Sequence, residues 1–116
     1  MLKNKTRDKV LAKRTKTCKT LISKAIGLMF SKRKTLIFCF DKEQITSLHM
    51  FFVFYPIDVI FLDKNKIIVE IKENFKPFTF YTPKNKAKYI IELKNNTIKE
   101  TNTKIGDIIS FNCRVN

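Results

Sequence analysis

The sequence predicts an α+β domain with a mainly antiparallel, curled or barrel-like β-sheet and one amphipathic helix near the amino terminus. Three observations lead to this class. Apolar residues recur at helical spacing most clearly between residues 18 and 29. From residue 36 onward, short apolar or alternating runs follow one another with turn residues between them. The chain has 116 residues, 44% of them hydrophobic, which suits a single domain with one core.

The helix is expected near residues 17 to 27. Thr15 or Thr17 can accept hydrogen bonds from its first free amide groups, and Gly27 can supply the left-handed residue that ends it. The apolar face collects residues with the 3-4-3-4-3 spacing of one side of a helix, which are Cys18, Leu21, Ile22, Ala25, Ile26 and Met29. This spacing predicts an amphipathic helix that packs against the sheet.

The clearest hairpin joins residues 57–62 to residues 67–71 through the turn residues 63–66. Because proline cannot donate to a central ladder, Pro56 in front of it marks a bend or an edge. Alternation along the second strand predicts a core face of Ile67, Val69 and Ile71, and a largely solvent-facing side of Ile68, Glu70 and Lys72.

Two further strands are expected at residues 88–93 and 108–111. Between them, Asn95 and Asn96 can take left-handed backbone, and a short helical turn is expected near residue 98. The predicted core contains Leu21, Ile22, Ile26, Val59, Phe61, Val69, Ile71, Ile91 and Leu93.

No linker or repeat divides the chain, so we expect a basic arm at residues 1–9 and a single β-rich domain at residues 10–116. The three cysteines, Cys18, Cys39 and Cys113, form no Cys-x-x-Cys pair, and we expect them to be reduced thiols. The sequence shows neither an export signal nor a run long enough to span a membrane, which favours a cytoplasmic location.

The positive charge is concentrated near the amino terminus. The chain carries a formal charge of +14, and residues 1–34 hold twelve Lys or Arg against the single acid Asp8. A basic segment of this kind can attract an anionic partner such as nucleic acid. Compositional drift is the alternative explanation, because the whole chain is rich in Lys, Asn and Ile.

Several segments, taken together and in order, resemble a known family. They are residues 27–30 (GLMF), 48–50 (LHM), 56–63 (PIDVIFLD), 69–71 (VEI), 76–78 (KPF), 81–83 (YTP), 89–93 (YIIEL) and 105–107 (IGD). The chain resembles the domain of unknown function 192 family, also called uncharacterised protein family 0127, in its short archaeal form. The resemblance covers roughly residues 10 to 112. It implies a small β-rich domain and transfers no catalytic residue.

The common catalytic and cofactor motifs are missing from the sequence. The two glycines, Gly27 and Gly106, lie too far apart for a phosphate-binding loop or a dinucleotide fingerprint. A zinc site needs clustered ligands, whereas His49 is the only histidine and each cysteine is isolated. We therefore expect no metal and no cofactor.

His49 and Asp58 are polar residues inside apolar strands, and they are the candidate catalytic pair. If the chain reversed about residues 53 and 54, they would lie opposite each other and could form a hydrogen bond. The residues between them include no Gly, Asn or Asp to make the turn. In the structural alternative, an inward Asp58 accepts backbone amides and fixes a bend.

The candidate binding residues are basic or aromatic. Phe75, Phe78, Phe80 and Tyr81, with lysines between them, could stack on unpaired bases. The alternative is that they plug an open end of the sheet. Together with the basic segment, the candidate binding set is Lys13, Arg14, Lys16, Lys19, Phe78 and Tyr81.

These observations favour a non-enzymatic binding or accessory module over an enzyme. The alternatives are a small enzyme that uses His49 and Asp58, and a weak, nonspecific nucleic-acid binder that uses the basic segment. The binding module ranks first because the sequence lacks catalytic motifs and its positive charge is concentrated in one segment.

Overall fold

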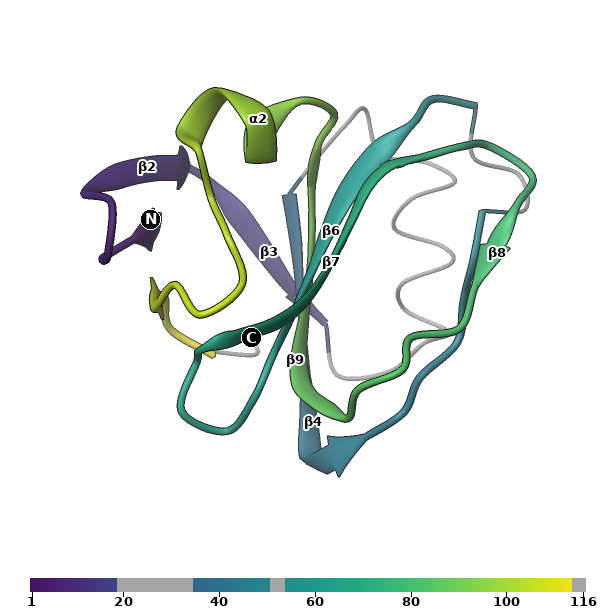
Figure 1. Ribbon diagram of the computed structural model, residues 1–116, viewed down its shortest axis with the longest axis horizontal. Helices are drawn as coiled ribbons and strands as arrows, with labels where there is room; N and C mark the ends of the chain where they lie inside the picture. Colours follow the sequence, from purple (N-terminus) through teal and green to yellow (C-terminus); the bar gives the residue numbers. More distant parts are fainter. Residues whose placement is uncertain (19–34, 51–53, 114–116) are drawn as a thin grey trace.

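A central β-sheet divides the domain, with a smaller sheet on each side (Figure 1). The computed structural model describes residues 1–18, 35–50 and 54–113. Its strands are β1 (Leu2–Asn4), β2 (Lys9–Ala12), β3 (Thr15–Cys18), β4 (Thr35–Gln44), β5 (Leu48–His49), β6 (Ile57–Leu62), β7 (Ile68–Phe75), β8 (Phe80–Tyr81), β9 (Ala87–Lys94) and β10 (Ile109–Ser110). The helix of the described part is α2 (Thr97–Thr101).

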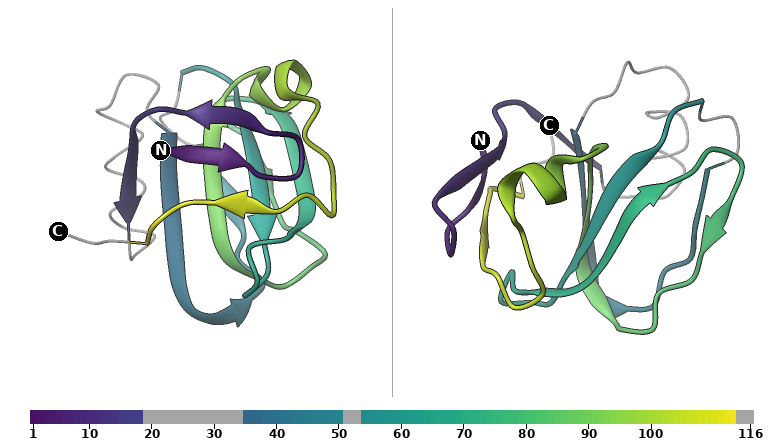
Figure 2. Two further views of the ribbon diagram at one scale, coloured as in Figure 1. Left: turned by 90° about the vertical axis from the view of Figure 1, so that its left-hand side faces the viewer. Right: turned by 45° about the horizontal axis from the view of Figure 1, so that its top comes forward.

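The central sheet has five strands in the order β3-β4-β9-β6-β7. Only β3 and β4 run parallel, and the other neighbours in this sheet are antiparallel. A three-stranded sheet, β10-β1-β2, crosses one face, as the left view of Figure 2 shows. The pair β5-β8 lies on the opposite side in Figure 1.

Both faces of the central sheet are buried, which explains why all six residues of β6 are buried. On the side of β5 and β8, Val59 and Phe61 pack into a cluster with Leu48 and Met50. On the side of α2 and the three-stranded sheet, β6 contributes to a second cluster that includes Leu2, Ile60, Leu62, Ile98 and Ile109. The domain therefore has two apolar layers instead of the single core expected from its length.

The predicted α+β class with a barrel-like sheet is wrong, and so is the expected start of its amino-terminal amphipathic helix. The described residues are mostly strand, with the short α2 as their helix, and the three sheets that they form do not close into a barrel. Thr17 and Cys18, where the helix was expected to begin, lie in β3 and pair with Ile37 and Phe38 of β4. The β-branched run at Thr15 and Thr17 suits this strand. Residues 19–27 of the predicted helix, with the predicted core residues Leu21, Ile22 and Ile26, lie outside the described residues.

The hairpin between β6 and β7 is confirmed, but the faces assigned to its second strand are wrong. Phe61 pairs with Glu70, whereas Leu62 pairs with Ile68, so one extra residue is inserted in β7. This bulge breaks the simple alternation that the sequence suggested. Ile68 and Glu70 are buried, while Val69, which was predicted to be core, is only half-buried.

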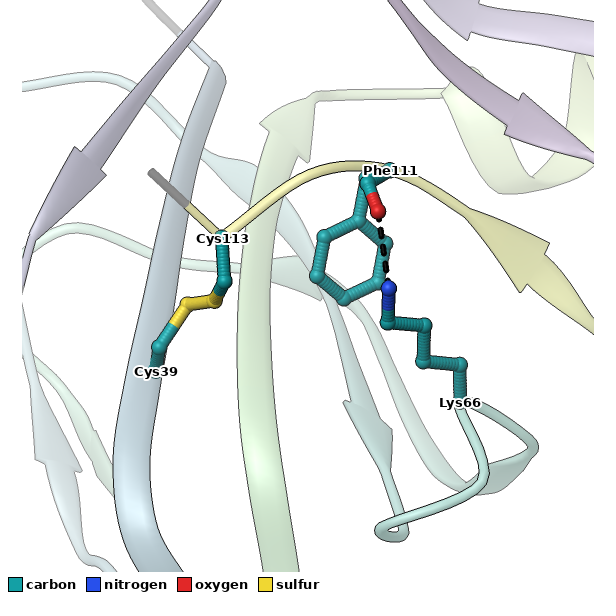
Figure 3. Close-up of a disulfide and its surroundings, with 4 residues drawn as sticks. All are labelled: Cys39, Lys66, Phe111 and Cys113. Carbon is teal, nitrogen blue, oxygen red and sulfur yellow. Dashed lines mark hydrogen bonds between the residues drawn. A yellow bond between two sulfur atoms is a disulfide. The ribbon is translucent and has the colours of Figure 1, made fainter. Parts of the chain in front are cut away.

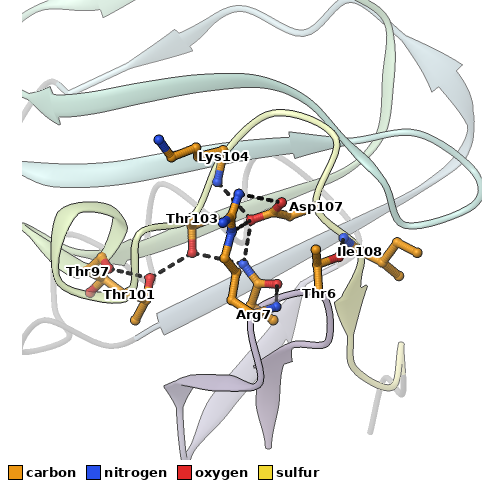
Figure 4. A network of polar contacts seen from close by, with 9 residues as sticks. Thr6, Arg7, Thr97, Thr101, Thr103, Lys104, Asp107 and Ile108 are labelled. Carbon is orange, nitrogen blue, oxygen red and sulfur yellow. Dashed lines mark hydrogen bonds and ion pairs between the residues drawn. The ribbon is translucent and has the colours of Figure 1, made fainter.

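A polar network joins the amino-terminal segment to the turn before β10 (Figure 4). The side chains of Arg7 and Asn4 donate to Asp107 Oδ2 over 3.0 and 2.9 Å, and the Lys104 amide donates to the same oxygen over 2.9 Å. Burial acts to raise the pKa of the Asp107 carboxyl, but these donors hold it below its usual value. Residues 1–9, which were expected to form a basic arm, therefore include β1, and Leu2 is fully buried.

Cys39 and Cys113 form a disulfide, so the prediction that all cysteines are reduced is wrong (Figure 3). The two residues are 74 positions apart in sequence, but their Cα atoms lie 6.5 Å apart, within the range that a disulfide spans. The segment after β10 reaches β4, and Lys66 Nζ supports it by donating to the Phe111 carbonyl over 2.8 Å. Spacing in the sequence could not reveal this contact, because it depends on how the C-terminal segment crosses the sheet.

Candidate functional site

A pocket of about 330 Å³ lies where β6 begins and β9 ends. The last pair of the β6–β9 ladder is Ile57 with Lys94. Pro56 has no N–H to donate, so the ladder stops there and the two chains diverge. The pocket between them is lined by Tyr55, Pro56, Ile57, Leu93, Lys94, Asn95 and Asn96. One wall is therefore largely apolar, and the other is polar and basic.

The polar wall contains an unsatisfied acceptor. The Oδ1 atom of Asn95 is buried and has no hydrogen-bond partner among the described residues. Asn96 takes the left-handed conformation, with φ 73°, and starts the turn into α2, which holds Asn95 against the pocket. A buried acceptor without a donor costs about 1 to 3 kcal/mol, and because this oxygen has almost no accessible surface, a ligand in the pocket does not satisfy it.

The predicted pair His49 and Asp58 are not cross-strand partners. His49 pairs with Phe80 of β8, and Asp58 pairs with Leu93 of β9. The proposed pairing of residues 49 and 58 is therefore wrong, because residue 49 belongs to the separate β5–β8 pair. The His49 side chain lies outside what the structure describes.

Asp58 makes the structural contacts foreseen as the alternative to catalysis. Its side chain is 1% exposed. Oδ1 accepts from the Asn74 amide over 3.0 Å, and Oδ2 accepts from the Ile98 amide, also over 3.0 Å. Asn74 has a positive φ of 50° and lies at an irregularity of the β6–β7 ladder. The carboxylate thus ties this bulge to the start of α2.

The predicted basic residues of the described part are on the surface. Lys13, Arg14 and Lys16 are exposed and follow one another from the end of β2 into β3. Lys19 lies outside the described residues. Arg7, which counted toward the basic segment, is instead bound to Asp107.

The aromatic segment divides into buried and exposed members. Phe75 is 1% exposed and belongs to the core beside β5, whereas Phe78 and Phe80 are 55% and 75% exposed. Phe78 has a positive φ of 61° and meets the ring of Phe54 edge-on at 5.5 Å. Phe75 is therefore part of the core, and Phe78 and Phe80 stay accessible.

The half-buried Tyr81 and the buried Glu70 form a pair behind that segment. The Tyr81 hydroxyl donates to Glu70 Oε2, and the Lys84 and Asn85 amides each donate to Oε1 over 2.9 Å. Burial acts to raise the pKa of the Glu70 carboxyl, but the hydrogen bonds from Tyr81, Asn85 and Lys84 lower it overall. Burial and the Glu70 carboxylate together raise the pKa of Tyr81 to about 12.

This pair gives the domain a pH dependence in alkali. A raised pKa means that the folded state favours the neutral phenol, so the stability from this contact is present below about pH 10 and is lost as the pH rises toward 12. A spectrophotometric titration at 295 nm should show one late phenol ionisation. We expect Tyr81→Phe to remove that step and Glu70→Gln to move it to lower pH. A late step that persists in Tyr81→Phe would contradict the assignment.

Sequence reasoning missed the pocket. Asn95 and Asn96 were correctly expected to make a turn, and Asn96 has the left-handed backbone, but nothing in a turn sequence shows that a side-chain oxygen will be buried without a donor. Pro56 was the useful signal, since it predicted a bend or an edge at this point of the chain. The residues that line the pocket together with Pro56 could be identified only once the register of β6 with β9 was known.

In residues 1–18, 35–50 and 54–113, no group of three or more His, Cys, Asp or Glu side chains gathers where it could hold a metal ion. No helix within these ranges is both long and apolar enough to cross a membrane.

The sequence of this chain is similar to those of archaeal proteins. Residues 2–111 match the family DUF192, described as "Uncharacterized ACR". The chain is 41% identical to a UPF0127 protein of Thermococcus sibiricus, over 96% of this chain and 74% of the relative. It is 37% identical to a UPF0127 protein of Pyrococcus furiosus, over 94% and 96% of the two chains.

A solved structure shares the fold. The crystal structure of a protein of unknown function from Novosphingobium aromaticivorans aligns with a TM-score of 0.76, at 20% identity, over 84% of this chain and 74% of that one. At this level of identity the likeness concerns the arrangement of strands alone.

Proposed function

Because the chain belongs to the DUF192 family, whose description names no reaction, we propose from its own geometry that it is a binding module for a small ligand held in the pocket between β6 and β9. The observation that carries the proposal is the pocket itself, which opens where the β6–β9 ladder ends and is lined by Tyr55, Pro56 and Ile57 together with Leu93, Lys94, Asn95 and Asn96. Small-molecule sites are typically concave and mostly apolar, with a few polar groups that orient the ligand.

The surroundings of Asp58 support binding over catalysis. A general base must reach a substrate proton, directly or through one water. Asp58 is 1% exposed, and each of its oxygens already accepts a backbone amide over 3.0 Å. Its contacts are those of a structural carboxylate, so the binding function ranks above an enzyme that uses Asp58.

Benzamide is a suitable first probe, because it combines a flat apolar ring with an amide donor. We expect a titration of the ¹⁵N-labelled protein to shift the amide resonances of Tyr55, Ile57 and Leu93 to Asn96. Tyr55→Ala should weaken this binding about tenfold, since it removes aromatic surface that lines the pocket.

The matched control is Asn65→Ala, an exposed residue of the β6–β7 turn that lies outside the pocket. This variant should bind benzamide like the parent. If the pocket resonances stay unmoved at every benzamide concentration, or if both variants lose binding equally, the pocket is not the ligand site.

The exposed Lys13, Arg14 and Lys16 support a second candidate function, weak nonspecific binding of nucleic acid. If the basic segment neutralises about six phosphates, the logarithm of the association constant should fall with the logarithm of salt concentration at a slope near −5 on duplex DNA. A salt titration with the parent chain and with Lys13, Arg14 and Lys16 changed to Gln measures this. An unchanged slope in the variant would exclude these residues as the contact.

A further inference from the structure

Phe54, Phe78 and Phe80 form an exposed aromatic patch on the β8 side of the domain. Phe54 and Phe80 are each 75% exposed, and Phe78 is 55% exposed. The rings of Phe54 and Phe78 meet edge-on, with their centroids 5.5 Å apart. An edge-on contact covers at most one ring face, so other ring faces stay open to a partner. Phenylalanine is usually buried, and a group of exposed apolar side chains is typical of a binding surface.

The backbone that carries Phe78 is strained and held in place. Phe78 has a φ of 61°, a left-handed conformation that is uncommon for a bulky residue. Its amide donates to the Met50 carbonyl over 2.8 Å, and the Met50 amide donates to the Thr79 carbonyl over 2.7 Å. Because Met50 is fully buried, these bonds fix the loop to the core. Enforced strain of this kind is concentrated at functional sites, which supports a binding role for Phe78.

The segment that carries Phe78 and Phe80 is basic. Residues 72–86 contain one acid, Glu73, and four lysines, which are Lys72, Lys76, Lys84 and Lys86. Lys76 is exposed, and the Thr79 hydroxyl donates to its carbonyl over 2.6 Å, so Lys76 belongs to the same turn as Phe78. The partner that complements this segment in charge is therefore anionic.

The surface around the rings is polar, which favours single-stranded nucleic acid over an anionic membrane. Thr79, between Phe78 and Phe80, is exposed. Ser47 and Thr82 flank the β5–β8 pair, and their exposed hydroxyls share a hydrogen bond of 2.9 Å. A segment that lies on a membrane presents a continuous apolar face. Proteins that hold single strands without reading their sequence instead combine aromatic rings, on which bases stack, with a basic surface for phosphates.

From these observations we infer that the aromatic patch binds single-stranded nucleic acid, with bases stacked on its rings and a phosphate at Lys76. This site is separate from the basic residues 13–16, which follow β2, because β2 and β8 lie on opposite sides of the domain (Figure 1). The inference goes beyond the pocket ligand and does not depend on it.

Fluorescence anisotropy tests the inference with three labelled probes of equal length, about 12 nucleotides. They are oligothymidylate, its duplex with oligoadenylate, and an abasic strand that keeps the phosphates but lacks the bases. The parent chain should bind oligothymidylate more tightly than either of the other two. Phe78→Ala should weaken this binding about tenfold, because one stacked base is lost, and should leave its salt dependence unchanged.

Matched variants separate stacking from charge and from apolar contact. Phe78→Tyr keeps an aromatic face and should bind oligothymidylate like the parent, whereas Phe78→Leu keeps apolar volume only and should bind almost as weakly as Phe78→Ala. Lys76→Gln should make the slope of the logarithm of affinity against the logarithm of salt shallower by about 0.7, the value for one phosphate on a single strand. Ile105→Ala is the control, since Ile105 is an exposed apolar residue in the turn before β10.

Several results would overturn the inference. They are equal affinity for oligothymidylate and the abasic strand, parental affinity in Phe78→Leu, and no binding of oligothymidylate at low salt. Binding that is lost when Lys13, Arg14 and Lys16 are changed to Gln, but kept in Phe78→Ala, would assign the contact to the basic segment. Vesicles of phosphatidylserine and phosphatidylcholine that bind the parent in place of oligothymidylate would identify a membrane surface. Thermal unfolding beside the parent confirms that each variant is folded.

Discussion

Replacing Cys113 by serine should lower the free energy of unfolding by roughly 4 kcal/mol, one of the two largest effects that we expect from a single substitution in this chain. The Cys39–Cys113 disulfide closes a loop with a sequence separation of 74, and a cross-link of this length removes much of the conformational freedom of the unfolded state. The cost falls on the whole domain, because the disulfide joins the end of the chain to β4 of the central sheet.

Urea unfolding with and without reductant measures this effect. Cys39→Ser should match Cys113→Ser, and reductant should destabilise the parent but neither variant. Cys18→Ser is the control, since Cys18 takes no part in this disulfide. A thiol assay on the unfolded, unreduced parent should detect one free thiol of the three cysteines. Three free thiols, with no effect of reductant on stability, would contradict the disulfide.

Replacing Asp58 by alanine should cost about 4 kcal/mol, because two backbone amides that it binds would lose their acceptors at once. The Ile98 amide is buried, so no water can replace its acceptor, whereas the Asn74 amide is only partly buried and lies at the irregularity of the β6–β7 ladder next to Ile57. Loss of this carboxylate would loosen both β7 at Asn74 and the contact between the start of α2 and β6.

Asp58→Asn is the matched comparison. Its side chain keeps one acceptor oxygen, so it can satisfy one of the two amides, and it should lose about half as much stability as Asp58→Ala. Hydrogen exchange should quicken at Asn74 and Ile98 in the alanine variant before it quickens elsewhere. A loss of less than about 1 kcal/mol in Asp58→Ala would show that Asp58 does not hold these elements together.

Local patterns predicted the parts of the fold that depend on neighbouring residues. The hairpin of β6 and β7 follows from two apolar runs with turn residues between them, and its pairing is antiparallel as expected. Val59, Phe61, Ile91 and Leu93 are fully buried, as predicted. The contacts of Asp58 were also foreseeable, because a lone carboxylate in an apolar strand needs donors.

Features that depend on distant contacts could not be read from those patterns. The residue inserted in β7 places Glu70 against the pair of amides at Lys84 and Asn85, and alternation alone had placed it in solvent. Thr17 and Cys18 fit a helical pattern, but they pair with β4, so tertiary pairing overrides local periodicity. The pocket requires the register of Ile57 with Lys94, which no local signal contains.

A crystal structure of the chain grown with benzamide tests the central claim most directly. The account predicts benzamide density in the pocket where the β6–β9 ladder ends, in contact with Tyr55 and Pro56. A pocket without benzamide, at a concentration that shifts amide resonances elsewhere in the chain, would contradict it.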